Sequence, residues 1–315
     1  MRIGIDLGGT ATKVGLVTDK GQISAFRTFP TPTHQGAEEV LRQIAQQCLA
    51  LCEEKNIKIE DIDSVGFGTP GFVDRENAII LYSANLQFEN VPIRSLFKSF
   101  FPHTPVLVEN DANCAAIAES VFGAARDAHN SVTLTLGTGV GAGVILDGRI
   151  FHGYENLAPE IGHLIIQADG EPCPCGRRGC MERYISANAL VRHAQQAAEE
   201  YPESLLAQKA RQEPISAKMP FDVAEAGDAT AKKVVEQYIE YLAVSISNVI
   251  YAFGPEIVLL GGGICNEGDR LLVPLRAALD RVLMPGSCGK TQIGLAQFRN
   301  EAGVVGSSVL HLLGA

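Results

Sequence analysis

Apolar and polar positions alternate along the first thirty residues, and two short glycine-containing stretches interrupt the alternation. A period of two is typical of strands with one buried face, and glycine pairs mark turns. The pattern predicts three consecutive antiparallel strands at residues 2–7, 13–18 and 22–29, separated at Gly8-Gly9 and at Lys20-Gly21. Helical spacing follows near residues 36–55, so the chain is expected to open as a three-stranded unit followed by a helix.

Strands and helices continue to alternate, and after residue 185 the chain becomes mainly helical. The longest helix is predicted to start at Asp228 and to end at Gly254-Pro255, before a strand at 257–260. The other predicted elements are strands at 64–68, 106–109, 132–136 and 141–146, and a helix at 112–122. The pattern therefore predicts an α/β protein.

One hairpin sequence occurs twice. Residues 9–23, GTATKVGLVTDKGQI, align with residues 137–150, GTGVGAGVILDGRI, when one extra residue is allowed at Lys20. The matching pairs are Gly9 and Gly137, Thr10 and Thr138, Gly15 and Gly143, Asp19 and Asp147, and Ile23 and Ile150. A repeated ββ unit predicts two like domains facing each other across a cleft. We place the boundary near residue 125, which gives domains 1–125 and 126–315.

The amino-acid composition and net charge limit the kinds of partner that this chain could bind. The 315 residues are 46% hydrophobic, enough for a sizeable core, and the formal net charge is −10. This charge and the lack of a basic run argue against nucleic acid or anionic lipid as a partner and favour a small soluble molecule. No leader and no apolar window of the roughly 18 residues that a membrane span needs is evident, so a cytoplasmic location is expected.

The repeated Gly-Thr turns suit phosphate binding. Glycine lets backbone N–H groups approach an anion closely, and two such turns can hold a polyphosphate from both sides. Asp6 would be repelled by phosphates unless a cation lay between them, so it is expected to support Mg²⁺ directly or through water. The alternative is an ordinary hairpin turn capped by Asp6. The expected nucleotide contacts are Asp6, Gly8, Gly9, Thr10, Lys13, Gly137, Thr138 and Gly139, with Gly261, Gly262 and Gly263 beside the adenine.

Asn110 and Asp111 come at the end of a predicted strand, directly before a helix. Ligands of α/β proteins bind at the carboxyl ends of strands, so Asp111 is a candidate general base that takes a proton from a substrate hydroxyl. Asn110 would orient the same substrate. The alternative is that Asp111 only caps the helix, because Asp is favoured at that position.

Three of the eight cysteines cluster, and the cluster predicts a metal site. Cys173, Cys175 and Cys180 supply three thiolates, with His163 as the nearest plausible fourth ligand and His152 as a weaker one. Three thiolates and one imidazole make a closed tetrahedral site for structural Zn²⁺. The alternative is a mobile loop with free thiols. The scattered cysteines are expected to be reduced thiols: Cys48, Cys52, Cys114, Cys265 and Cys288.

Two carboxylates, Glu160 and Glu182, bracket the cysteine loop. A folded loop would hold them in fixed positions near each other, where they could hydrogen-bond vicinal hydroxyls of a ligand. Each alone could instead be a solvated surface charge, the usual fate of Glu. Gly71 and Asn85 could also line the cleft, although turn chemistry explains them almost as well.

Taken together, these motifs resemble the ROK (repressor, ORF, kinase) sugar kinases of the actin, Hsp70 and hexokinase superfamily. The likeness covers nearly the whole chain and rests on six stretches in family order: DLGGT at 6–10, ENDAN at 109–113, LGTGVG at 136–141, EIGH at 160–163, CPCGRRGCME at 173–182 and LGGG at 260–263.

The resemblance implies two actin-like, ribonuclease H-like α/β domains with mixed sheets flanked by helices around a central cleft. The second would carry the zinc loop and a helical insertion. It also implies ATP-dependent phosphorylation of a hexose or N-acylhexosamine with Asp111 as base, and a homodimer or higher homo-oligomer. Sugar contacts would come from Gly71, Asn85, Asn110, Glu160, His163 and Glu182, and His163 can bind both metal and sugar.

The identity of the sugar stays open. Glucose is favoured, and the alternatives are N-acetylmannosamine, N-acetylglucosamine, fructose and allose. Pro159 replaces the glycine that the family usually has before E-x-G-H, which bears on the approach to Glu160. Two other classes compete: a sugar-sensing regulator, for which nothing precedes the first strand as a DNA-reading module, and a chaperone-like ATPase, for which the metal loop has no role.

Overall fold

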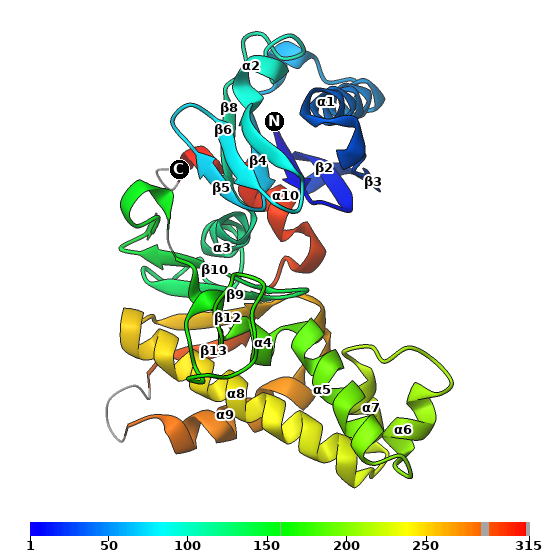
Figure 1. Ribbon diagram of the computed structural model, residues 1–315. Helices are drawn as coiled ribbons and strands as arrows, with labels where there is room; N and C mark the ends of the chain where they lie inside the picture. The colour runs from blue at the N-terminus through cyan, green and yellow to red at the C-terminus, as the bar shows by residue number, and fades with distance from the viewer. Residues whose placement is uncertain (158, 285–289, 313–315) are drawn as a thin grey trace. The chain divides into compact units, whose positions relative to one another are not determined.

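Figure 1 shows a computed structural model, which describes residues 1–157, 159–284 and 290–312. The fold is α/β, as predicted, with two five-stranded sheets, one three-stranded sheet and helices between and after them. Of the helices in the described parts of the chain, none is both long and apolar enough to span a membrane.

The first sheet begins with the three antiparallel strands expected from the period-two pattern. They are β1 (Arg2–Leu7), β2 (Ala11–Val17) and β3 (Ile23–Pro30). Two further strands, β4 (Ser64–Thr69) and β8 (Val106–Asn110), add in parallel, giving the order β3-β2-β1-β4-β8. The carboxyl ends of the parallel strands β1, β4 and β8 therefore share one edge of this sheet.

The second sheet repeats this order. Its strands are β9 (Ser131–Leu136), β10 (Val140–Leu146), β11 (Arg149–Ile150), β12 (Ile257–Gly261) and β13 (Gln292–Leu295). The order is β11-β10-β9-β12-β13, with β10 and β11 antiparallel and β12 and β13 parallel. Each strand thus has a counterpart in the first sheet, which confirms the repeat inferred from the two hairpin sequences.

Three helices, α1 (Ala37–Glu54), α3 (Asp111–Val121) and α8 (Ala229–Phe253), match the ranges predicted for them. Asp228 caps α8 with its side chain, and Gly254 ends that helix in the left-handed conformation, which glycine adopts without strain. The helices are α1 (Ala37–Glu54), α2 (Ile93–Phe97), α3 (Asp111–Val121), α4 (Glu182–Ile185), α5 (Ala187–Glu200), α6 (Leu205–Ala210), α7 (Met219–Glu225), α8 (Ala229–Phe253), α9 (Asp269–Val282) and α10 (Ala302–Ser307).

A third sheet was not predicted. It consists of β5 (Phe72–Asp74), β6 (Ile79–Ser83) and β7 (Phe88–Pro92), joined in antiparallel order. Its turns use Ala78 and Gln87 in left-handed conformations, with φ of 53° and 58°. Residues other than Gly, Asn and Asp rarely adopt positive φ, so these turns carry no sequence signal.

The chain forms two compact units. The first comprises Met1–Thr133, Gly143–Pro159 and Gln297–Ala315, and the second comprises Leu134–Ala142 and Glu160–Ala296. This division is not a single cut such as the one expected near residue 125, because the end of the chain returns to the first unit. The boundary near residue 125, inferred from the repeated hairpin, stays a prediction for domains 1–125 and 126–315.

Helix α10 anchors the returning segment by packing on β1, β4 and α3. Gly4 in β1 and Gly66 in β4 make this possible, since a Cβ at either position would overlap the α10 carbonyl oxygens of Val304 and Ser307. At the other end of α3, the buried carboxylate of Glu119 accepts the Phe298 N–H at 2.8 Å. The C-terminal segment therefore belongs to the core of the first unit.

Candidate active site

The first Gly-Thr turn, Gly8–Thr10, connects β1 to β2, and Thr10 is exposed. Asp6 precedes the turn and pairs across the strands with Lys13, whose Nζ lies 2.9 Å from Asp6 Oδ2. The partner of the carboxylate is thus an ammonium group on the next strand, which does not support the alternative of a turn cap. Both side chains stay partly exposed, at 21% for Asp6 and 28% for Lys13. A partly exposed carboxylate can still serve Mg²⁺, which prefers oxygen ligands.

The second Gly-Thr turn, at residues 137–139, is held from the side by Glu182. Oε2 of Glu182 accepts the Val140 N–H at 3.1 Å, and a Cβ on Gly139 would overlap the same carboxylate. The Ala187 N–H donates to the Gly137 carbonyl at 2.9 Å. Sequence reasoning placed Glu182 beside the sugar and missed its contact with this turn, since nothing in the spacing of residues 140 and 182 indicates it.

The triple glycine lies against the same turn region in the second unit. Gly262 has φ of 95°, and a Cβ there would overlap the carbonyl of Leu136, the last residue of β9. Gly261 ends β12, and Gly263 begins a short 3-10 helix. The structure therefore brings two of the predicted nucleotide stretches together, although adenine binding at Gly261–Gly263 stays a prediction.

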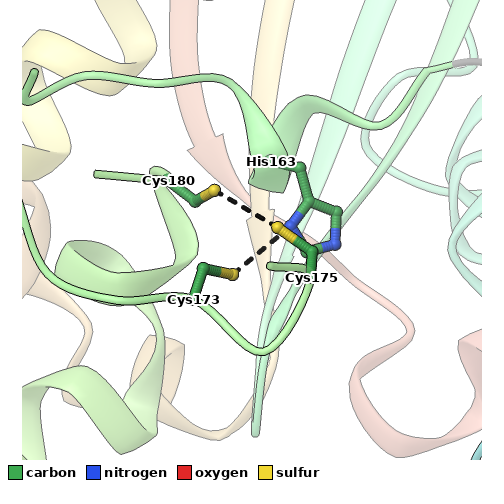
Figure 2. A group of neighbouring side chains, drawn as sticks. All are labelled: His163, Cys173, Cys175 and Cys180. Carbon is green, nitrogen blue, oxygen red and sulfur yellow. Dashed lines mark hydrogen bonds between the residues drawn. The ribbon is translucent and has the colours of Figure 1, made fainter. Parts of the chain in front are cut away.

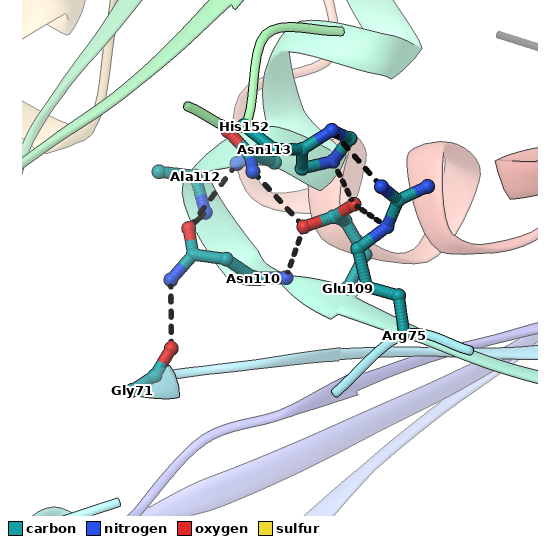
Figure 3. A network of polar contacts seen from close by, with 7 residues as sticks. All are labelled: Gly71, Arg75, Glu109, Asn110, Ala112, Asn113 and His152. Atoms are coloured by element: carbon teal, nitrogen blue, oxygen red, sulfur yellow. Dashed lines mark hydrogen bonds and ion pairs between the residues drawn. The ribbon is translucent and has the colours of Figure 1, made fainter. Parts of the chain in front are cut away.

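Asn110, not Asp111, caps helix α3 (Figure 3). Its Oδ1 accepts the N–H groups of Ala112 at 2.9 Å and Asn113 at 3.3 Å, and its Nδ2 donates to the Gly71 carbonyl at 3.4 Å. Asp111 is the first residue of the helix, with Oδ1 accepting the Ala112 N–H at 2.8 Å. The alternative in which Asp111 is merely the N-cap is wrong, because the neighbouring amide side chain takes that position.

The structure places Gly71 and Asn85, which were both expected to line the cleft, in different surroundings. Gly71, with φ of 97°, lies beside the Tyr82 carbonyl and is joined to Asn110. Asn85 instead packs its backbone against Gly9 of the first Gly-Thr turn. Both belong to the first unit, so one lies near Asp111 and the other near the predicted phosphate contacts.

The predicted metal ligands converge. Figure 2 shows the side chains of His163, Cys173, Cys175 and Cys180 pointing toward one another, and their ligand atoms all lie within 4.8 Å of one another. Cys173 Sγ lies 3.7 Å from His163 Nδ1, and Cys175 Sγ lies 3.6 Å from Cys180 Sγ. A tetrahedral zinc with Zn–S bonds of about 2.3 Å separates its ligands by about 3.7 Å, so this set fits Zn²⁺.

The charge state of the thiols favours the same conclusion. Burial, together with the neighbouring Cys175 and Cys173 thiols, raises the pKa of Cys180 to about 12. Three sulfur atoms held this closely therefore need a cation to become thiolates together. Cys48, Cys52, Cys114 and Cys265 are free thiols, as expected, and Cys288 lies outside the described residues.

His152 is not a metal ligand, contrary to the weaker alternative. Its Nε2 lies 2.8 Å from Oε2 of the buried Glu109, in the first unit, whereas the four clustered ligands belong to the second. Sequence reasoning also missed Glu109 and Arg75 as possible contributors. A carboxylate near the end of a buried strand, two residues before a candidate base, is the signal that could have indicated Glu109.

Glu160 and Glu182 lie close enough to affect each other. Partial burial raises the pKa of Glu160, and the charge of Glu182 raises it further, while His163 opposes the shift. Gly162 packs against the Val140 carbonyl, where a Cβ would overlap it. The E-x-G-H turn, Glu182 and the second Gly-Thr turn thus form one cluster within the second unit.

Comparisons with known proteins agree with these motifs. A family model described as the ROK family matches residues 2–312. A glucokinase of Thermotoga maritima is 36% identical over 97% of this chain and 95% of its own, and one of Halalkalibacterium halodurans is 34% identical over 98% and 94%. The crystal structure of a ROK family glucokinase from Streptomyces griseus, in complex with glucose and AMPPNP, has a TM-score of 0.82 and 32% identity, covering 98% of each chain.

Proposed function

The chain belongs to the ROK family, and we propose that it is an ATP-dependent sugar kinase acting on a hexose, with glucose as the favoured acceptor. The observation that carries the proposal is the start of α3. There Asn110 performs the capping, and the Asp111 carboxylate lies at the carboxyl end of β8. Ligands of α/β sheets bind at this edge, so Asp111 occupies a position suited to a base.

The reaction needs one proton acceptor. Asp111 takes the proton of the sugar hydroxyl while the hydroxyl oxygen bonds to the γ-phosphorus of ATP. The bond between the γ-phosphorus and the bridging oxygen of the β-phosphate breaks, and ADP leaves. Phosphoryl transfer depends mostly on positioning and charge neutralisation. Backbone N–H groups of the two Gly-Thr turns and the Lys13 ammonium supply positive potential for the phosphates. Mg²⁺, for which Asp6 is the candidate ligand, neutralises phosphate charge when bound.

The sugar contacts that we propose are Glu160, His163 and Glu182, with Asn110 and Gly71 from the first unit. The two carboxylates accept hydrogen bonds from vicinal hydroxyls, which are stronger than neutral ones. Zn²⁺ at His163 and the three cysteines would be structural, because four protein ligands leave no open position. The zinc ion would hold the cysteine loop, which Glu182 follows in the sequence, in a fixed conformation.

The proposed function is tested by ADP release with a panel of sugars: glucose, mannose, allose, fructose, N-acetylglucosamine and N-acetylmannosamine. Comparing kcat/KM among them measures specificity directly. We expect glucose to give the highest value. ADP release that no sugar raises above the sugar-free rate would refute the kinase proposal, and a higher value for an N-acylhexosamine would overturn the preference for glucose.

Glu182 is expected to affect nucleotide binding as well as sugar binding. Glu182→Ala removes the acceptor of the Val140 N–H, and Val140 is buried, so the second Gly-Thr turn loses its support. An unsatisfied buried donor costs about 1–3 kcal/mol, which predicts that the AMPPNP Kd rises about 5- to 150-fold without sugar present.

Glu160→Ala is the matched control for this prediction. It removes the other carboxylate, which has no hydrogen bond to the 137–140 turn among those described, so the glucose Kd should rise and the AMPPNP Kd should stay unchanged. Calorimetry of both variants with each ligand alone makes the comparison. Equal AMPPNP affinity in Glu182→Ala and the wild type would show that the Val140 contact does not support nucleotide binding.

A further inference from the structure

A largely buried polar network adjoins the start of α3 (Figure 3). Glu109 is 1% exposed, and its Oε2 lies 2.8 Å from His152 Nε2 and 3.0 Å from Arg75 Nε. Its other oxygen, Oε1, accepts the Asn110 N–H at 2.8 Å and the Asn113 Nδ2 at 2.9 Å. Oε1 thus contacts the backbone directly before Asp111 and a side chain two residues after it, so this one carboxylate holds the chain on both sides of the proposed base.

The contacts fix the tautomer of His152. Arg75 Nη1 lies 2.9 Å from His152 Nδ1, and because a guanidinium can only donate, Nδ1 must accept. The ring proton therefore resides on Nε2 and donates to Glu109. Burial opposes ionisation of Glu109, but the hydrogen bonds from His152 and Asn113 and the charge of Arg75 lower its pKa. Glu109 is thus a charged acceptor surrounded by donors.

We propose that Glu109, His152 and Arg75 are positioning residues for catalysis: they hold the 110–113 turn in the geometry that Asp111 needs, without contacting sugar or nucleotide. The inference rests on the proposed role of Asp111 in phosphoryl transfer. Displacing a reacting group by about 1 Å can lower a rate about 100-fold, so support of this kind acts on kcat.

Two substitutions disturb the network in different ways. His152→Phe keeps a flat ring but removes both the donor to Glu109 and the acceptor for Arg75. Glu109→Gln keeps the size of the side chain but turns one acceptor into a donor. The His152 ring cannot adapt by moving its proton, since an Nδ1–H would then face Arg75. His152→Gln is the conservative variant, because an amide offers one donor and one acceptor.

The test measures kcat with glucose and ATP, the glucose Kd by calorimetry, and hydrogen exchange of the backbone amides of residues 110–113. His152→Phe and Glu109→Gln should each lower kcat about 10- to 100-fold, speed exchange at residues 110–113 and leave the glucose Kd within about twofold. His152→Gln should recover part of both losses. His103→Phe, an exposed histidine of the same unit, should match the wild type.

The outcomes distinguish a failure of the positioning role from a failure of the proposed function. If the wild type shows no sugar-dependent ADP release, the proposed function fails, whereas exchange at 110–113 still reports whether the network holds the turn. Unchanged exchange at residues 110–113 in both variants overturns the inference, as does a loss of glucose affinity as large as the loss of kcat. If His152→Phe does not fold, the inference is tested by comparing kcat, glucose Kd and hydrogen exchange between Glu109→Gln and His152→Gln.

Discussion

Asp111→Asn lowers kcat by about 10²- to 10⁴-fold while glucose binds with nearly wild-type affinity. Asn has the size of Asp and can hydrogen-bond a sugar hydroxyl, but it cannot accept the proton that the hydroxyl loses on attack. The loss therefore falls on the chemical step. Steady-state kinetics paired with calorimetric glucose binding to the same protein measures both quantities.

The variant is expected to fold normally, which makes the result interpretable. The Asp111 Oδ1 that accepts the Ala112 N–H has an equivalent in Asn, and the capping of α3 is supplied by Asn110. Asp127→Asn, at a side chain that is 91% exposed, is the matched control and should keep wild-type kinetics. A near-wild-type kcat in Asp111→Asn would remove Asp111 from the mechanism.

Protein purified without added zinc is expected to carry about one Zn²⁺ per chain, and Cys175→Ser should carry almost none. Serine cannot supply a thiolate, and the remaining ligands form an open, weaker site. Because Glu160 and Glu182 bracket the loop, the glucose Kd of Cys175→Ser should rise at least about tenfold and the melting temperature should fall. Metal analysis, calorimetry and thermal unfolding measure the three effects.

The control for the zinc prediction is Cys265→Ser. Cys265 is a free thiol in the same unit and is not one of the four clustered ligands, so this variant should keep its zinc. Wild-type protein with a zinc content near zero, or an unchanged content in Cys175→Ser, contradicts the metal assignment.

The elements that the sequence predicted are those with strong local signals. The strands at residues 2–30 follow from a period-two pattern with glycine turns, and α8 follows from a long apolar stripe between Asp228 and Gly254. The repeated Gly-Thr hairpin also predicted the shared architecture of the two sheets, because a common ancestral unit keeps its strand order. The metal ligands were predictable because cysteine spacing constrains them tightly.

What the sequence could not predict depends on contacts between distant residues. Two such contacts are the packing of α10 on β1 and the hydrogen bond between Glu182 and Val140. Each joins positions far apart in the chain, and no periodic pattern in the sequence predicts it. His152 was considered a weaker candidate for the fourth metal ligand, because the sequence alone does not show which group a histidine near cysteines contacts. Only the fold shows that a buried carboxylate, Glu109, lies within reach of it.

The central claim, transfer of phosphate from ATP to a sugar, is tested most directly by mass spectrometry of the reaction products. Purified protein incubated with glucose, ATP and Mg²⁺ should form hexose monophosphate in the same amount as ADP, and Asp111→Asn should form far less of both. ADP produced without hexose monophosphate would identify an ATPase, and the absence of both products would contradict the assignment of a glucose kinase.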